Sequence, residues 1–279
     1  MALKDKLEKN EFALLAEFVP PKGTDVTLFL EHAVRLKGKL DAWLVPELPG
    51  AVMRMSSLGG SYLLLQNGLE PVMEINGRDR NRLALQADLL SAATAGIKNI
   101  VAAKADSPQA GDMPETKAVN DLNTSDLLDM LAGFNRGSDF SGRDLPGSTD
   151  FTIGATAEHL SGGLTKLTEV GVAFVIAPPV FDAAGIESAL TLCRTANIKI
   201  IPTVMVLKSV GMARYIQAHS DSMRIPDPII ERIQAADSVQ RESIKIAREI
   251  ISILKKEGCA GVLISSMGWE CVIPEILES

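Results

Sequence analysis

A chain of 279 residues, 46% of them hydrophobic, is long enough to bury a large core. Its formal net charge of −7 and its aromatic content of 4% argue against nucleic-acid binding, which relies on basic patches and stacking side chains. The charged amino terminus lacks the apolar segment of a signal peptide, and no stretch is apolar enough for a membrane span. Three widely spaced cysteines show neither a disulfide framework nor zinc-site spacing. We therefore expect a cytoplasmic protein with no membrane span, no nucleic-acid partner and no metal.

The predicted strands recur at a regular interval. The first four are expected to begin near Phe12, Asp41, Glu70 and Asn99, each 29 residues after the last, with a helical pattern after each of the first three. Further strands are predicted at residues 151–157, 173–179, 199–207 and 261–266. Helices are predicted at residues 25–37, 56–67, 79–95, 125–135, 160–170, 184–196, 210–219 and 237–257.

Most of these strands are nearly continuous apolar runs, as expected of parallel strands that are buried on both faces. Eight alternating strand–helix units predict an α/β fold, a single (β/α)8 TIM barrel over residues 1–279. An open doubly wound sheet is the alternative, because strand order cannot be read from sequence. Either fold places ligands at the carboxyl ends of the strands.

Two loops are longer than barrel closure requires. Residues 107–124 follow the fourth strand, so this loop belongs to the ligand-facing end. Residues 136–150 are rich in Gly, Ser and Asp and precede the fifth strand, which places them at the opposite end.

The segment from residue 77 to residue 96 predicts a charged turn that leads into a helix. Asp79 is expected to cap this helix, and Gly96 to end it in the left-handed conformation. The helical period places four residues on one face: Leu83, Ala87, Leu90 and Thr94.

Candidate site residues stand where predicted strands end. Glu17 interrupts an apolar run, and burial there would raise its pKa toward that of a useful general acid; pairing with a Lys or Arg is the alternative. Asp106 ends the fourth strand and could be a loop cap, but Lys104 on the same side of the strand makes a ligand site plausible. His159 follows the fifth strand, although a lone His is usually a surface residue. The barrel predicts one group of side chains at its mouth: Glu17, Glu47, Asn76, Asp106, His159, Asp182 and Ser265.

Several motifs occur together and in order. They are Glu-Phe-Val-Pro-Pro-Lys at residues 17–22, then residues 51–58 and 68–71, the Arg-Asp-Arg-Asn-Arg run at 78–82, and Arg224-Ile225-Pro226. With them the chain resembles the methylenetetrahydrofolate reductase family over nearly its whole length.

The resemblance implies a TIM barrel that binds flavin adenine dinucleotide (FAD) and reduces methylenetetrahydrofolate to methyltetrahydrofolate, in the one-carbon metabolism that serves methionine biosynthesis. By that likeness Glu17 matches the catalytic glutamate that protonates the pterin, and Asp106 matches the aspartate between flavin and folate. The implied cofactor-binding residues are Asn76, Lys104, Ala105, Asp106, Thr156, His159 and Lys166. The implied reductant is NADH, NADPH or an electron-donating partner protein, and a homo-oligomer is expected.

The chain also departs from the family pattern. Ala105 stands where relatives have Gly, Pro46 replaces a hydroxyl residue, and Pro178 replaces a glutamine expected to contact the pterin. After Lys166, Leu167 replaces the second residue of a basic pair. Lost polar contacts weaken ligand binding. Three functions therefore stay open: a flavin-dependent folate reductase with a retuned pocket, a non-reducing folate-binding relative or accessory subunit, and a barrel reused for another flavin substrate or for methyl transfer.

Overall fold

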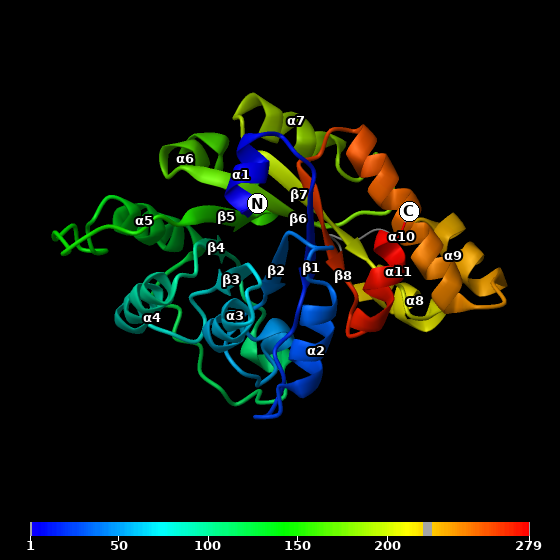
Figure 1. The fold of residues 1–279 in the computed structure, drawn as a ribbon, viewed down its shortest axis with the longest axis horizontal. Helices are drawn as coiled ribbons and strands as arrows, with labels where there is room; N and C mark the ends of the chain where they lie inside the picture. Colours follow the sequence, from blue (N-terminus) through cyan, green and yellow to red (C-terminus); the bar gives the residue numbers. More distant parts are fainter. Residues whose placement is uncertain (1, 220–224, 279) are drawn as a thin grey trace. The chain divides into compact units, whose positions relative to one another are not determined.

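The protein is a closed barrel of eight strands in the order β1 to β8, as seen in a computed structural model that describes residues 2–219 and 225–278 (Figure 1). The strands are β1 Ala13–Glu17, β2 Ala42–Val45, β3 Pro71–Ile75, β4 Asn99–Ala102, β5 Thr152–Thr156, β6 Val172–Pro179, β7 Lys199–Met205 and β8 Gly261–Ser265. Sequential order in a closed barrel confirms the predicted (β/α)8 fold and rules out the open doubly wound sheet.

The helices alternate with the strands as predicted, with several additions. They are α1 Leu3–Glu8, α2 Thr27–Arg35, α3 Ser57–Gln66, α4 Arg82–Ala95, α5 Thr124–Asn135, α6 Leu164–Glu169, α7 Glu187–Thr195, α8 Val210–His219, α9 Asp227–Ala235, α10 Val239–Lys256 and α11 Ile273–Leu277. Helices α1, α9 and α11 are not among the predicted helices. The helix predicted at residues 160–170 is divided into a 3₁₀ turn, η3 Ala157–Gly162, and the short α6.

Two compact units make up the described chain. The first contains residues 2–17, 38–41, 176–219 and 225–278, and the second contains residues 18–37 and 42–175. The prediction of one domain over the whole chain stays a prediction.

In the first unit, β8 pairs in parallel with both β7 and β1. The register joins Ala13 to Gly261 and Ala16 to Ile264. Gly261 is required at its position because an added Cβ would lie 2.4 Å from the carbonyl oxygen of Ala13. The buried face of α10 packs on β7 and β8, which gives this part of the barrel its outer cover.

In the second unit, β2, β3, β4 and β5 form a continuous parallel ladder. Helix α4 contacts α3 and begins three residues later than predicted. Its N-cap is Asn81, whose side chain accepts a 3.0 Å hydrogen bond from the Ala84 N–H, so the prediction that Asp79 caps it was wrong. Gly96 ends the helix with φ of 99°, as predicted.

The buried face of α4 also differs from the prediction. Leu83 is 75% exposed and Leu90 is 43% exposed, so the predicted apolar face points to solvent. The buried residues are Leu85, Leu89 and Ala92, which have the same helical spacing. Two overlapping apolar patterns exist in this helix, and the period alone cannot choose between them.

The long loop after β4 is tied to the neighbouring loops of the second unit. The Asp112 carboxylate accepts a 2.9 Å bond from the Met53 N–H and pairs with Lys22 at 2.8 Å. Further along, Asp121 pairs with Arg82 at 2.7 Å, and hydrogen bonds from Arg82 lower the pKa of Asp121 to about 2. Two ion pairs, one in each half of the loop, therefore hold it in place.

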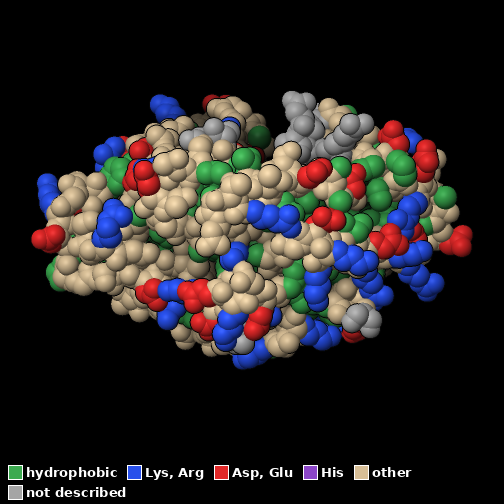
Figure 2. Space-filling model, turned by 90° about the horizontal axis from the view of Figure 1, so that it is seen from above, with side chains coloured by type: hydrophobic (Ala, Val, Ile, Leu, Met, Phe, Trp, Pro, Cys, Tyr) green, Lys and Arg blue, Asp and Glu red, His purple; other side chains and the backbone are tan. Residues whose placement is uncertain are grey.

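The loop at residues 136–150 contacts the start of α4. The Phe140 N–H donates to the Gln86 side chain at 2.9 Å, and the Arg82 guanidinium lies 5.5 Å from the centre of the Phe140 ring. Acidic and basic side chains are intermixed on the face of the molecule in Figure 2.

We predict that Gly77→Ala destabilises the protein by about 2 kcal/mol, because a Cβ at this position would lie 2.0 Å from the Leu122 carbonyl oxygen. Gly23→Ala is the matched control, since nothing lies within 4 Å of its added Cβ. Urea unfolding of both variants tests this expectation. Equal midpoints for the two variants would show that the loop after β4 is free to shift away from β3.

Candidate functional site

A buried carboxylate organises the loop after β2. Glu47 is 4% exposed, and it accepts a 2.7 Å bond from the Ser57 N–H and a 2.6 Å bond from the Arg80 guanidinium. Arg80 also pairs with Asp88 at 2.9 Å. A carboxylate removed from water needs such charged and N–H partners. Glu47 is therefore fully engaged in holding the start of α3 and the loop after β3.

The loops after β2, β3 and β4 are joined by a buried arginine. Arg78 is 4% exposed, pairs with Asp79 at 2.6 Å and donates to the Asp106 carbonyl at 3.1 Å. The hydrogen bond with Asp79 raises the pKa of Arg78, although burial acts in the opposite direction. Asn76 supports the same region, donating to the Glu47 carbonyl at 3.2 Å and accepting from the Arg78 N–H at 3.1 Å. Sequence reasoning identified the arginine-rich run but gave Arg78 no role.

Asp106 caps a turn in the loop after β2. Its carboxylate accepts a 2.8 Å bond from the Gly50 N–H, and its side chain is otherwise exposed. The turn is unusual because Leu48 and Ala51 both have positive φ, at 47° and 54°. Such backbone is strained for residues other than Gly and needs support from its surroundings. One carboxylate oxygen of Asp106 thus acts as the predicted loop cap.

Lys104 and Thr156 share a carboxylate at the end of β5. Glu158 accepts a 3.0 Å bond from the Lys104 N–H and a 2.6 Å bond from the Thr156 hydroxyl. Lys104 itself is exposed, and the next residue, Ala105, is half-buried.

His159 carries a buried nitrogen without a partner among the described residues. Nδ1 lies 2.9 Å from the Thr156 carbonyl, which assigns the proton to Nδ1 in the neutral ring and leaves Nε2 as an acceptor. Nε2 is buried and has no hydrogen bond. Buried polar atoms are nearly always paired, so Nε2 indicates a position for a donor from a bound molecule.

Lys166 contacts a different element. It forms an ion pair with Asp129 of α5, and neither residue belongs to the loops that hold Lys104, Asp106 and His159. Its role as a cofactor contact stays a prediction.

In the first unit, Glu17 is the last residue of β1 and lies beside Ser265, one step beyond the Ala16–Ile264 pair. Burial raises the pKa of Glu17; a hydrogen bond with Ser265 lowers it, and the negative charge of Glu270 raises it. The groups that act on Glu17 are thus a hydroxyl and a second carboxylate, and none of those described is a Lys or Arg. The side chain keeps partial access to solvent. Such surroundings favour the neutral acid form.

The loop after β8 holds Glu270 in place. The Ser266 hydroxyl donates to Glu270 at 3.3 Å, and the Trp269 N–H donates to the Ser266 carbonyl at 3.1 Å. The Lys208 ammonium lies 5.4 Å from the centre of the Trp269 ring. Sequence reasoning missed Glu270, because nothing in the local pattern links it to β1.

The remaining predicted mouth residue of the first unit is Asp182, an exposed residue that accepts a 2.9 Å bond from the Gly185 N–H. Glu17 and Asp106 belong to different units, so their grouping around one mouth stays a prediction. Arg224 of the predicted late motif lies outside the described residues. Within residues 2–219 and 225–278, no cluster of three His, Cys, Asp or Glu side chains is placed to hold a metal ion.

The sequence profile described as methylenetetrahydrofolate reductase matches residues 2–279. The chain belongs to the methylenetetrahydrofolate reductase family. This confirms the resemblance drawn from the sequence motifs. A search of curated proteins found no match.

Solved structures agree with this family's barrel fold. An uncharacterized protein from Clostridium thermocellum, which binds two copies of 5-methyl-5,6,7,8-tetrahydrofolic acid, is similar with a TM-score of 0.63. It is 14% identical, and the match covers 99% of this chain and 96% of that one. DmoA from Hyphomicrobium sulfonivorans is similar with a TM-score of 0.57 at 8% identity, over 96% of this chain and 86% of that one. None of the described helices is both long and apolar enough to cross a lipid bilayer.

We predict that Glu17→Gln becomes more stable relative to the wild type as the pH rises above 4.5, the ordinary pKa of a Glu side chain. The folded state raises the pKa of Glu17, so the wild type loses stability between 4.5 and that raised pKa, while Gln does not ionise. Urea unfolding over a pH series measures the difference, with the exposed Glu31→Gln as control. A difference that stays constant with pH would contradict the raised pKa.

Proposed function

We propose that this family member reduces 5,10-methylenetetrahydrofolate to 5-methyltetrahydrofolate with a bound flavin, and that Glu17 is the general acid. The observation that carries the proposal is the desolvated Glu17 carboxyl at the end of β1, with a pKa raised above its ordinary value. Family membership over residues 2–279 supports the reaction class. The folate bound by the similar Clostridium thermocellum protein supports the choice of substrate.

The chemistry explains why a neutral carboxylic acid is useful. A hydride adds to an electron-poor carbon, and the methylene carbon of the substrate becomes one when its five-membered ring opens to an iminium. Ring opening needs a proton on a pterin nitrogen, and a carboxyl with a raised pKa holds its proton to a higher pH than an ordinary Glu side chain. Glu17 donates the proton, and Ser265 positions the carboxyl through its hydrogen bond. The negative charge of Glu270 disfavours ionisation of Glu17.

The second unit holds residues that fit a flavin. The unpaired Nε2 of His159 can accept a hydrogen bond from the cofactor, the exposed Lys104 ammonium can donate to it, and Asp106 keeps one carboxylate oxygen beyond its bond to Gly50. We propose that these residues, with Asn76, Ala105, Thr156 and Lys166, hold FAD. When bound, FAD would supply the hydride. Its reductant would be NADH, NADPH or an electron-donating partner protein, and we expect a cytoplasmic homo-oligomer that serves methionine biosynthesis.

We predict that Glu17→Gln leaves flavin binding and flavin reduction intact but slows reoxidation by methylenetetrahydrofolate by ~10²–10⁴-fold, the usual contribution of a general acid. Gln keeps the shape of the side chain but cannot supply the proton. Stopped-flow absorbance measures the rates of flavin reduction and of flavin reoxidation in the wild type and the variant.

Equal folate half-reaction rates in wild type and variant would reject Glu17 as the acid. A wild type that binds folate but never reoxidises with it would favour a non-reducing relative or an accessory subunit. Pro178, exposed at the end of β6, would then be the first position to change to Gln.

We predict that Lys104→Ala weakens flavin binding by about 10–150-fold, because it removes a charge-assisted contact to the cofactor. Lys98→Ala is the matched control, since Lys98 is an exposed lysine that precedes the same strand at its opposite end. Equilibrium dialysis at limiting FAD compares the variants. Unchanged occupancy in Lys104→Ala would remove Lys104 from the flavin site.

A further inference from the structure

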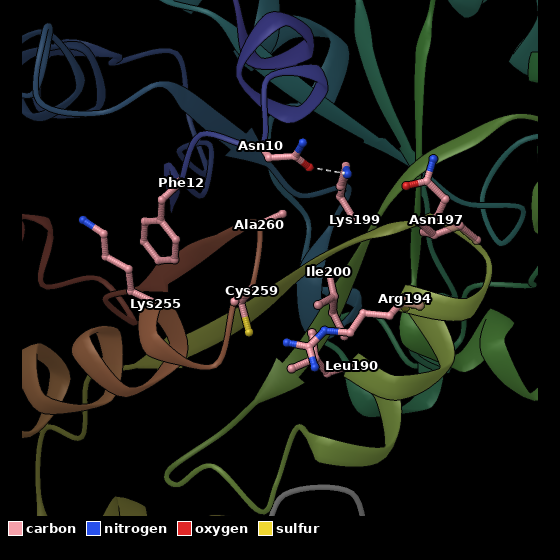
Figure 3. A pocket seen from close by; sticks show the side chains of 13 residues that line it. Asn10, Phe12, Leu190, Arg194, Asn197, Lys199, Ile200, Lys255, Cys259 and Ala260 are labelled. Carbon is pink, nitrogen blue, oxygen red and sulfur yellow. Dashed lines mark hydrogen bonds between the residues drawn. The ribbon is translucent and has the colours of Figure 1, made fainter.

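The first unit contains a cavity of about 560 Å³ at the opposite end of its strands from Glu17 (Figure 3). Phe12 precedes β1, Lys199 begins β7 and Ala260 precedes β8, so the cavity lies at the amino ends of three strands. Its other walls are the last turns of α7 and α10. Its volume falls within the range of small-molecule sites, which is roughly 300–1,000 Å³.

The cavity lining is basic although the whole chain is acidic. Arg194, Lys199 and Lys255 line it, and none of the 13 lining residues that the structure describes is Asp or Glu. The chain as a whole carries a formal net charge of −7. On the face of the molecule that Figure 2 shows, acidic and basic side chains are intermixed. A concave surface with one sign of charge concentrates ligands of the opposite sign.

Local contacts account for only part of this basic charge. Arg194 donates to the Glu257 carbonyl at the end of α10, and Lys199 donates to the Asn10 side chain at 2.6 Å. Lys255 lies 5.6 Å from the centre of the Phe12 ring. Cations in the last turn of a helix are favoured by the helix dipole, which explains Arg194 and Lys255 but not Lys199. A guanidinium has five N–H donors and an ammonium three, so donors remain for a ligand.

The floor of the cavity is apolar. Leu190, Ile200, Cys193 and Cys259 line it and are buried. Desolvation raises the pKa of each of the two thiols to about 11, so both are neutral at physiological pH and act as small apolar groups. Figure 3 shows the Arg194 side chain extending from α7 toward Cys259, with its end close to Leu190 and Ile200. An anionic head and an apolar body therefore have complementary surfaces in the same cavity.

We propose that this cavity binds a small organic anion, whose carboxylate contacts Arg194 and Lys199 and whose apolar body contacts Phe12, Leu190 and Cys259. The site is separate from the proposed reductase site, because it lies at the amino ends of β7 and β8 whereas Ser265 and Glu17 lie at carboxyl ends. The fork of donors on Arg194 suits a carboxylate.

The test uses two probes of the same shape, 2-naphthoate and its neutral analogue 2-naphthamide, in isothermal titration calorimetry with the full chain. We expect naphthoate to bind the wild type at least about tenfold more tightly than naphthamide. Lys199→Gln and Arg194→Gln should each weaken naphthoate by about tenfold and leave naphthamide unchanged. Lys256→Gln, which changes the exposed neighbour of Lys255 on α10, is the matched control and should change neither.

The proposal is overturned by three results: no naphthoate binding, equal affinity for the two probes, or naphthoate affinity that Lys199→Gln leaves unchanged. Arg194→Gln removes a bond to the end of α10, so circular dichroism of each variant accompanies the titrations. If Arg194→Gln fails to fold, the naphthoate affinities of Lys199→Gln and Lys255→Gln test the proposal, and each variant should bind naphthoate more weakly than the wild type. None of these results depends on folate reduction, so the titrations test this inference independently of the proposed function.

Discussion

The parallel ladder between β1 and β8 is the constraint on which the chemistry of the first unit depends. Its register brings Glu17 beside Ser265, and the close approach of Ala13 to Gly261 fixes that register. A slip of one residue would turn Glu17 to the opposite face of the strand, because side chains alternate along a strand. The ladder therefore determines whether the carboxyl is desolvated, and desolvation is the main cause of its raised pKa.

Glu17 has different partners from the carboxylates that hold the loops of the second unit. In the second unit, Glu47, Asp112 and Asp121 each form an ion pair with a Lys or Arg and tie loops together. In the first unit, Glu17 faces a hydroxyl and Glu270. A charged carboxylate stabilises loops, whereas a neutral one can donate a proton. This difference separates residues that build the site from the residue proposed to act in it.

Much of the barrel could be predicted from sequence, because parallel strands buried on both faces leave apolar runs at regular spacing. The strands start within about one residue of their expected positions. The N-cap of α4 was predicted at Asp79, but the Asp79 side chain forms an ion pair with its neighbour Arg78. Whether these two side chains pair depends on their burial, which the local sequence does not show. The bond from Gly50 to Asp106 joins residues far apart in sequence, and so does the contact of Glu17 with Glu270. Such partners are set by the fold, so local patterns cannot reveal them.

The central claim is that Glu17 is a desolvated carboxylic acid whose pKa the fold raises above that of an ordinary Glu side chain. Carbon-13 NMR of protein labelled at the Glu side-chain carboxyl, with Glu17→Gln to assign the signal, follows its ionisation directly. The account predicts a midpoint above 4.5, the ordinary pKa of a Glu carboxyl. A midpoint at or below 4.5 would show that Glu17 is charged in the folded protein, and the account of Glu17 as the general acid would be wrong.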